Sequence, residues 1–152
     1  MGKNFLRSLS IKAILAGSVA WFVAYNIFGA VLFIILLGNI GAYPTTEAEA
    51  TEAFKKALLA NMPFMVMLML ISTLCSVLSG YVAAKIAKCH PRRNGAFATS
   101  ILCVYSVYDM VQGDHLLPVW LDAFSTALIP FFGMLGGALY AARKTANARF
   151  CD

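Results

Sequence analysis

Long hydrophobic runs separated by short polar segments dominate the chain. Four such runs cover residues 13–38, 63–85, 94–111 and 118–142. An α-helix rises about 1.5 Å per residue, so each run is long enough, the third only just, to cross a hydrocarbon layer about 30 Å thick. The pattern predicts an all-α fold with a single domain, in which four transmembrane helices form a bundle.

The segment between the first two runs has a different pattern. Thr46 and Glu49 have the spacing of a capping box, in which each side chain satisfies a backbone N–H at the start of a helix. We therefore expect a short amphipathic helix over residues 46–61, lying on the outer membrane surface or continuing into the second run. Its apolar face is formed by Phe54, Leu58 and Leu59.

Small residues recur at every fourth position on two of the runs. This spacing lets helix backbones approach closely, which matters in lipid because no hydrophobic effect drives helices together there. It predicts contact faces in the second run, formed by Ser72, Ser76, Gly80 and Ala84, and in the fourth run, formed by Gly133, Gly137 and Ala141.

Pro130 lies inside the fourth run. Proline has no backbone N–H, so it removes one helical hydrogen bond and bends the helix. The carbonyl that loses its partner must then be satisfied by a neighbouring helix or by water.

Composition and charge agree with a membrane setting. Of the 152 residues, 61% are hydrophobic and 12% are charged, against about 25% charged in soluble domains. Ten of the 12 basic residues flank the runs on one side, and six of the seven acidic residues flank them on the other. This is the positive-inside pattern. It predicts a multi-pass protein of the cell inner membrane with both termini in the cytoplasm.

The same charge distribution bears on partners. The net charge of +5 follows from the positive-inside pattern, so it does not indicate a nucleic-acid partner. We expect the basic side to bind anionic lipid head groups on the cytoplasmic face of the bilayer.

The ends of the second and fourth runs are similar to each other. The second closes with Ser79-Gly80-Tyr81-Val82-Ala83-Ala84-Lys85, and the fourth with Gly136-Gly137-Ala138-Leu139-Tyr140-Ala141-Ala142-Arg143. These ends resemble a broad, largely uncharacterised group of small bacterial four-helix membrane proteins with a Gly-Gly-Tyr-x-Ala-Ala-basic helix end. Ser79 stands where that group has its first glycine. The resemblance implies topology only; it carries no activity and no site residue.

Catalytic and cofactor chemistry finds little support in the residues. Cys89 and Cys151 fall on the predicted cytoplasmic side, and Cys75 and Cys103 fall inside runs, so no cysteine is placed for oxidative disulfide chemistry. Both histidines lie between runs, whereas a haem in such a fold needs an axial ligand inside it. We expect no metal, no cofactor and no enzymatic activity.

The candidate functional residues are polar groups within or beside the runs. Ionisable residues inside a membrane usually mark a transport path, and none lies at the middle of a run here. Asn26 is the most polar residue near the middle of the first run, and we expect it to hydrogen-bond to a neighbouring helix. Asp109 is expected to lie at the outer interface. The alternative is a small cation-binding site at the outer mouth, formed by Asp109, Asp114, His115 and Asp122.

Three functions of different classes remain compatible with the sequence. The first is a non-enzymatic accessory or structural subunit, or an assembly factor, of a larger inner-membrane complex, whose partners are other membrane subunits. The alternative is a small homo-oligomeric channel, transporter or holin-like pore. The third is a membrane enzyme or binding protein for lipid or quinone.

Overall fold

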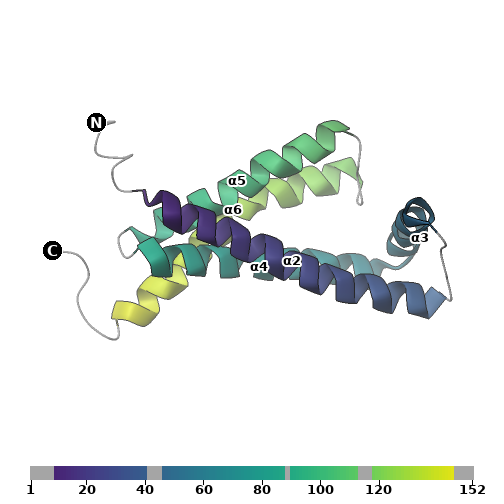
Figure 1. Cartoon of the computed structure of the whole chain (residues 1–152), viewed down its shortest axis with the longest axis horizontal. Helices are drawn as coiled ribbons and strands as arrows, with labels where there is room; N and C mark the ends of the chain where they lie inside the picture. Colours follow the sequence, from purple (N-terminus) through teal and green to yellow (C-terminus); the bar gives the residue numbers. More distant parts are fainter. Residues whose placement is uncertain (1–8, 41–45, 88–89, 113–117, 146–152) are drawn as a thin grey trace.

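The structure is a computed structural model that describes residues 9–40, 46–87, 90–112 and 118–145. The chain is all-helical, as predicted: the described residues form five helices and no strand. In chain order the helices are α2 (Ile11–Ile40), α3 (Glu47–Ala60), α4 (Met62–Ala87), α5 (Pro91–Gln112) and α6 (Val119–Thr145) (Figure 1).

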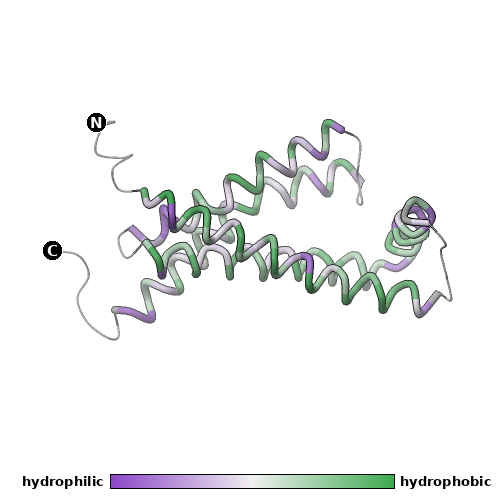
Figure 2. The backbone as a smooth tube through the Cα atoms, viewed as in Figure 1, coloured by the Kyte–Doolittle hydropathy of each residue, from purple (hydrophilic) through white to green (hydrophobic). Residues whose placement is uncertain are grey.

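Three helices, α2, α4 and α6, are long and apolar enough to cross a membrane. They correspond to the first, second and fourth hydrophobic runs. The third run is α5, whose 22 residues give a length of about 33 Å. Its composition is more polar than that of the others, and Figure 2 shows polar positions interspersed along it, whereas α2 and α4 are hydrophobic over long stretches. Among the described residues, three helices are therefore candidates to span a membrane.

Helix α5 begins three residues earlier than predicted, at Pro91. The hydrophobic pattern alone placed its start at Asn94, after the basic pair Arg92 and Arg93. Proline fits the first turn of a helix because its missing N–H has no helical partner there. The helix therefore begins at the proline and includes the basic residues.

The four long helices form two antiparallel hairpins, α2 with α4 and α5 with α6. They meet at the end of the molecule where α2 begins and α6 ends, and they diverge toward the opposite end (Figure 1). We call the first the packed end, around Gly17, Gly80 and Gly133, and the second the open end, around Met62 and Val119. Helix α3 lies across α2 and α4 at the open end.

Glycines bring the helices together at the packed end. A Cβ on Gly133 of α6 would overlap Thr99 Oγ1 and approach the Gly95 carbonyl of α5 to 2.6 Å, and a Cβ on Gly80 of α4 would overlap the Gly133 carbonyl. A Cβ on Gly17 of α2 would lie only 2.9 Å from the Cβ atoms of two alanines on α4 and α5. Backbones approach this closely only where side chains are absent. The residues with four-residue spacing that lie buried are Ser76, Gly80, Ala84, Gly133 and Gly137.

Polar contacts also join α2 to α5 at the packed end. The buried Asn94 side chain accepts a hydrogen bond from the Ser10 backbone N–H at 2.9 Å. The Ser18 hydroxyl donates to the Ala98 carbonyl at 2.8 Å. The first of these bonds satisfies one of the backbone donors that the start of a helix leaves without a partner.

The two similar helix ends contact each other at the packed end. The rings of Tyr81 and Tyr140 lie edge to face, with centroids 5.5 Å apart and planes at 87°. Arg143 Nη1 donates to the Tyr81 hydroxyl at 3.4 Å. The repeated aromatic-Ala-Ala-basic pattern therefore marks one point of contact between α4 and α6.

Helix α3 spans the segment that was predicted to form a short helix. The Thr46 hydroxyl accepts a hydrogen bond from the Glu49 N–H at 3.3 Å, as a capping residue does. Phe54 and Leu58 are buried in a cluster with Leu32, Leu36 and Leu68 of α2 and α4. Leu59, predicted on the same face, is 48% exposed, because each residue turns the helix by about 100° away from its neighbour.

Candidate functional site

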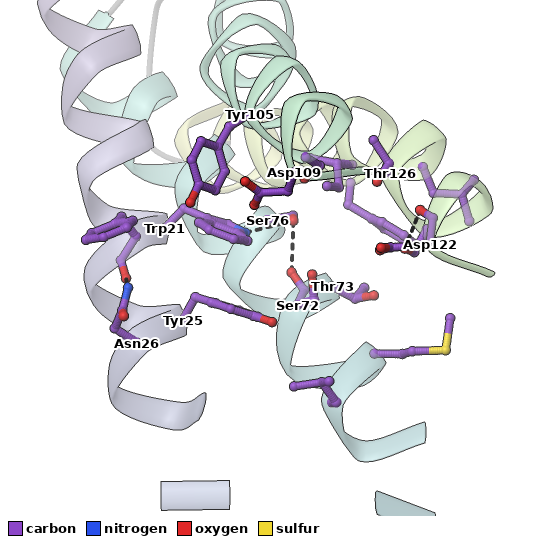
Figure 3. Close-up of a pocket in the computed structure, with 18 residues that line it drawn as sticks. Trp21, Tyr25, Asn26, Ser72, Thr73, Ser76, Tyr105, Asp109, Asp122 and Thr126 are labelled. Atoms are coloured by element: carbon purple, nitrogen blue, oxygen red, sulfur yellow. Dashed lines mark hydrogen bonds between the residues drawn. The ribbon is translucent and has the colours of Figure 1, made fainter. Parts of the chain in front are cut away.

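A cavity of about 500 Å³ lies between the two hairpins, where they begin to diverge (Figure 3). All four long helices contribute side chains to its wall. Residues from α2 are Trp21, Phe22, Tyr25 and Asn26; from α4, Leu68, Met69, Ser72, Thr73 and Ser76; from α5, Tyr105, Ser106 and Asp109; and from α6, Asp122, Ser125, Thr126, Leu128, Ile129 and Phe132.

Two carboxylates line this cavity from different helices. Asp109 comes from the last turns of α5, and Asp122 from the first turn of α6. No hydrogen bond or ion pair joins Asp109 to another described residue, while Asp122 acts electrostatically on the Tyr25 hydroxyl of α2. No Lys, Arg or His occurs among the described residues that form the wall. The described part of the wall therefore has two acidic side chains and no basic one.

Aromatic rings form the α2 side of the cavity and are held in fixed positions. Trp21 and Tyr25 stack with centroids 4.6 Å apart and planes at 8°. Trp21 Nε1 donates to the Ser76 hydroxyl at 3.2 Å, and this hydroxyl donates in turn to the Ser72 carbonyl at 2.8 Å. The indole is therefore oriented by α4 before any ligand is present. Tyr105 of α5 also lines the cavity, and Figure 3 shows it near Asp109.

Hydroxyl groups make the rest of the wall polar. Ser72, Thr73 and Ser76 follow one side of α4, and Ser125 and Thr126 lie on α6. The Ser125 hydroxyl donates to the Asp122 backbone carbonyl at 2.9 Å. A serine or threonine hydroxyl retains acceptor capacity after donating, so these groups can still interact with a ligand.

The carbonyl released by Pro130 is satisfied at the edge of this cavity. In a regular helix the N–H of residue 130 bonds to the carbonyl of Thr126, and proline lacks that N–H. The Cys103 thiol of α5 donates to the Thr126 carbonyl, with sulfur and oxygen 3.1 Å apart. Of the two partners predicted for this carbonyl, a neighbouring helix or water, the structure shows the neighbouring helix.

The structure brings three of the five predicted polar residues to one place. Asn26, Asp109 and Asp122 all line the cavity, while Asp114 and His115 lie outside the described residues. The prediction that Asn26 bonds to a neighbouring helix is wrong: its Nδ2 donates to the Phe22 carbonyl of its own helix at 2.7 Å. The hairpins have diverged at this level, and the carbonyl one turn back is within reach of the amide.

Other residues of the site were not identified from sequence. Ser72 and Ser76, which were predicted as packing residues, also line the cavity. Ser76 is buried in the contact with Trp21. Trp21 and Tyr25 were missed altogether. A signal was present, because hydroxyl residues occur at similar depth on the second and fourth runs.

The donor set limits the chemistry of the site. In the described ranges no group of three or more His, Cys, Asp or Glu side chains comes together, and calcium takes six to eight oxygen ligands. Among its described residues the wall has no His that could act as a base for a serine nucleophile, and no Cys nucleophile. The carboxylates, aromatic rings and hydroxyl groups of the wall are suited to binding an organic molecule.

Comparison with known proteins adds no relative. The chain matches no family model, no curated protein and no solved structure.

Proposed function

We propose that the chain is a small membrane transporter, not an enzyme, that takes up an organic solute between its two hairpins. The observation that supports this proposal is the cavity lined by all four long helices, with two carboxylates on its wall. Ionisable side chains inside membrane proteins are costly and mark solute pathways. Of the functions that the sequence left open, the transporter is the one this geometry favours.

The proposal includes α5 as a fourth transmembrane helix. Its side away from the other helices is apolar and exposed, with Val104 at 72% and Val111 at 80%. Soluble surfaces rarely carry such a stripe, whereas lipid requires it. The polar residues of α5, among them Thr99 and Asp109, face its neighbours or the cavity.

We place both termini in the cytoplasm of the cell inner membrane. The basic residues Lys12, Lys85 and Arg143 lie at the packed end, where α2 begins and α4 and α6 end. Acidic residues at the open end include Glu52 on α3. The positive-inside rule then assigns the packed end to the cytoplasm, where anionic lipid head groups surround it.

In this orientation α3 is an amphipathic helix on the outer surface. Its buried side chains, Phe54 and Leu58, pack on α2 and α4, and its exposed side carries Glu52 and Lys56. The cavity then opens outward, and the glycine contacts around Gly133 close the inner side. Transport would require that contact to open, with Pro130 as the point in α6 where the helix can bend.

A second candidate is the accessory subunit of a larger complex, or a self-associating subunit. Its support is that α2 carries the exposed Asn26 three residues before Gly29, whose added Cβ would meet nothing within 4 Å. A polar side chain beside a glycine is a common helix-contact pattern in lipid. Partners for this face would be other membrane subunits or a second copy.

Solute flux tests the transporter proposal directly. We expect the purified chain in liposomes to accelerate uptake of at least one impermeant solute from a set that includes benzyltrimethylammonium, benzenesulfonate and sorbitol, relative to empty liposomes. Ser72→Phe, which fills the cavity, should abolish that flux. Leu74→Phe places the same ring on the lipid-facing side of α4, where Leu74 is 67% exposed, and should leave it unchanged.

Two outcomes contradict the proposal. One is a folded chain that accelerates none of these solutes. The other is flux that persists in Ser72→Phe. In either case the accessory role becomes the stronger candidate, and it predicts stable co-purification with larger subunits from native membranes in mild detergent.

A further inference from the structure

We propose that two copies of this chain pair through one face of α2, with their Asn26 side chains hydrogen-bonded to each other at the centre of the contact. The Asn26 face is formed by Leu15, Val19, Phe22, Asn26 and Ala30. Transport does not depend on this pairing, because the cavity lies within one chain. The partner assigned to the face is a second copy and not another membrane subunit.

The Asn26 face is uncovered along its length in the described part of the chain. Leu15, Val19 and Phe22 are 55%, 60% and 57% exposed, and Asn26 and Ala30 are exposed as well. Asn26 is the only polar residue of the face and lies at the middle of α2, which is one of the candidate membrane spans. The middle of a span is farthest from bulk water, so a hydrogen bond between helices meets the least competition there.

The Asn26 amide retains hydrogen-bonding groups for a partner. Within the chain its Nδ2 donates once, to the Phe22 carbonyl at 2.7 Å. A carboxamide has two N–H donors and a carbonyl acceptor, so one N–H and Oδ1 have no hydrogen-bond partner among the described residues. These remaining groups are self-complementary, because Oδ1 of each copy can accept a hydrogen bond from Nδ2 of the other.

Symmetry brings the two amides to the same place. Copies with the same charge pattern insert into the membrane in the same orientation. A two-fold axis that relates two such copies therefore runs along the membrane normal, and the contact around it uses the same residues from both. Asn26 of one copy then lies at the same depth as Asn26 of the other. A second copy always supplies the matching amide, whereas a different subunit would need a polar group of its own at this depth.

The spacing of the face suits a pair of parallel helices. Leu15, Val19, Phe22 and Asn26 are separated by four, three and four residues, which is the spacing of the contact positions in a two-stranded coiled coil. A single asparagine at such a position fixes the register and the number of helices. Phe22 and Asn26 also line the cavity, so the contact lies beside the cavity wall.

Cysteine cross-linking of the full chain in native membranes locates the contact. The parent is Cys89→Ser/Cys151→Ser, which keeps the two cysteines of the long helices and gives the blank. We expect Val19→Cys in this parent to form a covalent dimer with a short bis-methanethiosulfonate reagent, because residue 19 of one copy faces residue 19 of the other. Val31→Cys is the matched control and should stay at the level of the blank. Val31 is 51% exposed on the same helix but is turned about 140° from Asn26, at about 100° per residue.

Removal of the amide measures its share of the contact. Sedimentation equilibrium of the full chain in a density-matched detergent gives the Kd of the dimer. We expect Asn26→Leu to raise this Kd by about fivefold or more, as loss of hydrogen bonds between helices in lipid does. Asn26→Gln keeps a carboxamide and should retain most of the affinity, and Val31→Leu should leave the Kd unchanged. Circular dichroism of each variant separates loss of pairing from loss of fold.

Four results would overturn the proposal. The first is a parent that sediments as a monomer and whose Val19→Cys variant does not cross-link to itself. The second is equal cross-linking of Val19→Cys and Val31→Cys, which random collision would produce. The third is a cross-linked product of another mass in place of the dimer, which would assign the face to a different membrane subunit. The fourth is a folded Asn26→Leu variant with the Kd of the parent.

The pairing and the transporter proposal fail separately. A monomer that moves solute in liposomes would overturn the pairing and leave the transporter proposal standing. A dimer that cross-links at Val19→Cys but moves none of the solutes would support the pairing and contradict the transporter proposal.

Discussion

The packed end and the open end are built from the same four helices but by opposite means. At the packed end, Gly80, Gly95 and Gly133 let backbones touch, and no space remains for even a methyl group. At the open end the hairpins separate, and the cavity wall carries carboxylates, hydroxyls and rings. Along α6 the change occurs on either side of Pro130. We interpret the packed end as the part that stabilises the fold, and we propose the open end as the part that binds a ligand.

The difference has a physical origin. Helices in lipid gain nothing from hydrophobic burial against each other, so their association depends on close packing and interhelical hydrogen bonds. The contacts at the packed end, including the bond from Ser18 to the Ala98 carbonyl, supply both. Beyond the cavity the two hairpins diverge (Figure 1), and the Asp109 carboxylate on the cavity wall makes no hydrogen bond or ion pair with another described residue. Substitutions at the two ends should therefore have unequal effects on stability.

The largest effect is expected from Gly133→Ala at the packed end. The new Cβ would overlap Thr99 Oγ1 and press on the Gly95 carbonyl, and backbone atoms cannot move aside as a flexible side-chain tip can. We expect the free energy of unfolding to fall by at least about 2 kcal/mol, as overpacking of a tight interior does. Thermal unfolding in dodecylmaltoside, followed by circular dichroism, measures the change.

Gly29→Ala is the matched control, because its Cβ would meet nothing within 4 Å. Alanine is the better helix former by up to about 1 kcal/mol, so this variant should be as stable as the parent or slightly more so. Equal melting temperatures for Gly29→Ala and Gly133→Ala would show that the glycine contact does not hold the helices together.

The packed end was largely predictable from sequence, since small residues at four-residue spacing marked Gly80 and Gly133. Gly95 was missed because it directly follows the polar segment at the start of α5. Its role becomes apparent only when the Gly133 carbonyl is placed against it. The four-residue spacing identified packing residues on α4 and α6 but not the packing residue Gly95 on α5.

The open end was predictable only in its charges. Asp109 and Asp122 were noticed because an ionisable residue within or beside an apolar run is unusual. The contact between Trp21 and Ser76 depends on how α2 and α4 are rotated about their axes. Both helices are apolar on all sides, so no hydrophobic stripe shows which side faces inward. For the same reason the partner of Asn26 was predicted wrongly.

A smaller effect on stability is expected where the two ends meet. Cys103→Ala removes the donor to the Thr126 carbonyl that Pro130 leaves without its helical partner. Loss of such a bond should lower the free energy of unfolding by about 1 kcal/mol. Cys103→Ser keeps a donor of similar size and should retain most of that stability. The comparison of the two melting temperatures is the measurement, and identical values would mean that the thiol acts only as packing.

The smallest effect on stability is expected from Asp109→Asn at the open end. The carboxylate makes no hydrogen bond or ion pair with another described residue, and Asn is nearly the same size. The melting temperature without ligand should therefore change by less than the equivalent of about 0.5 kcal/mol, as at a surface site with no structural role. A large loss of stability would mean that Asp109 holds the hairpins in place, and the division between a stabilising end and a binding end would then fail at its main residue. A neutral result combined with reduced solute flux would show that this residue serves transport and not the fold.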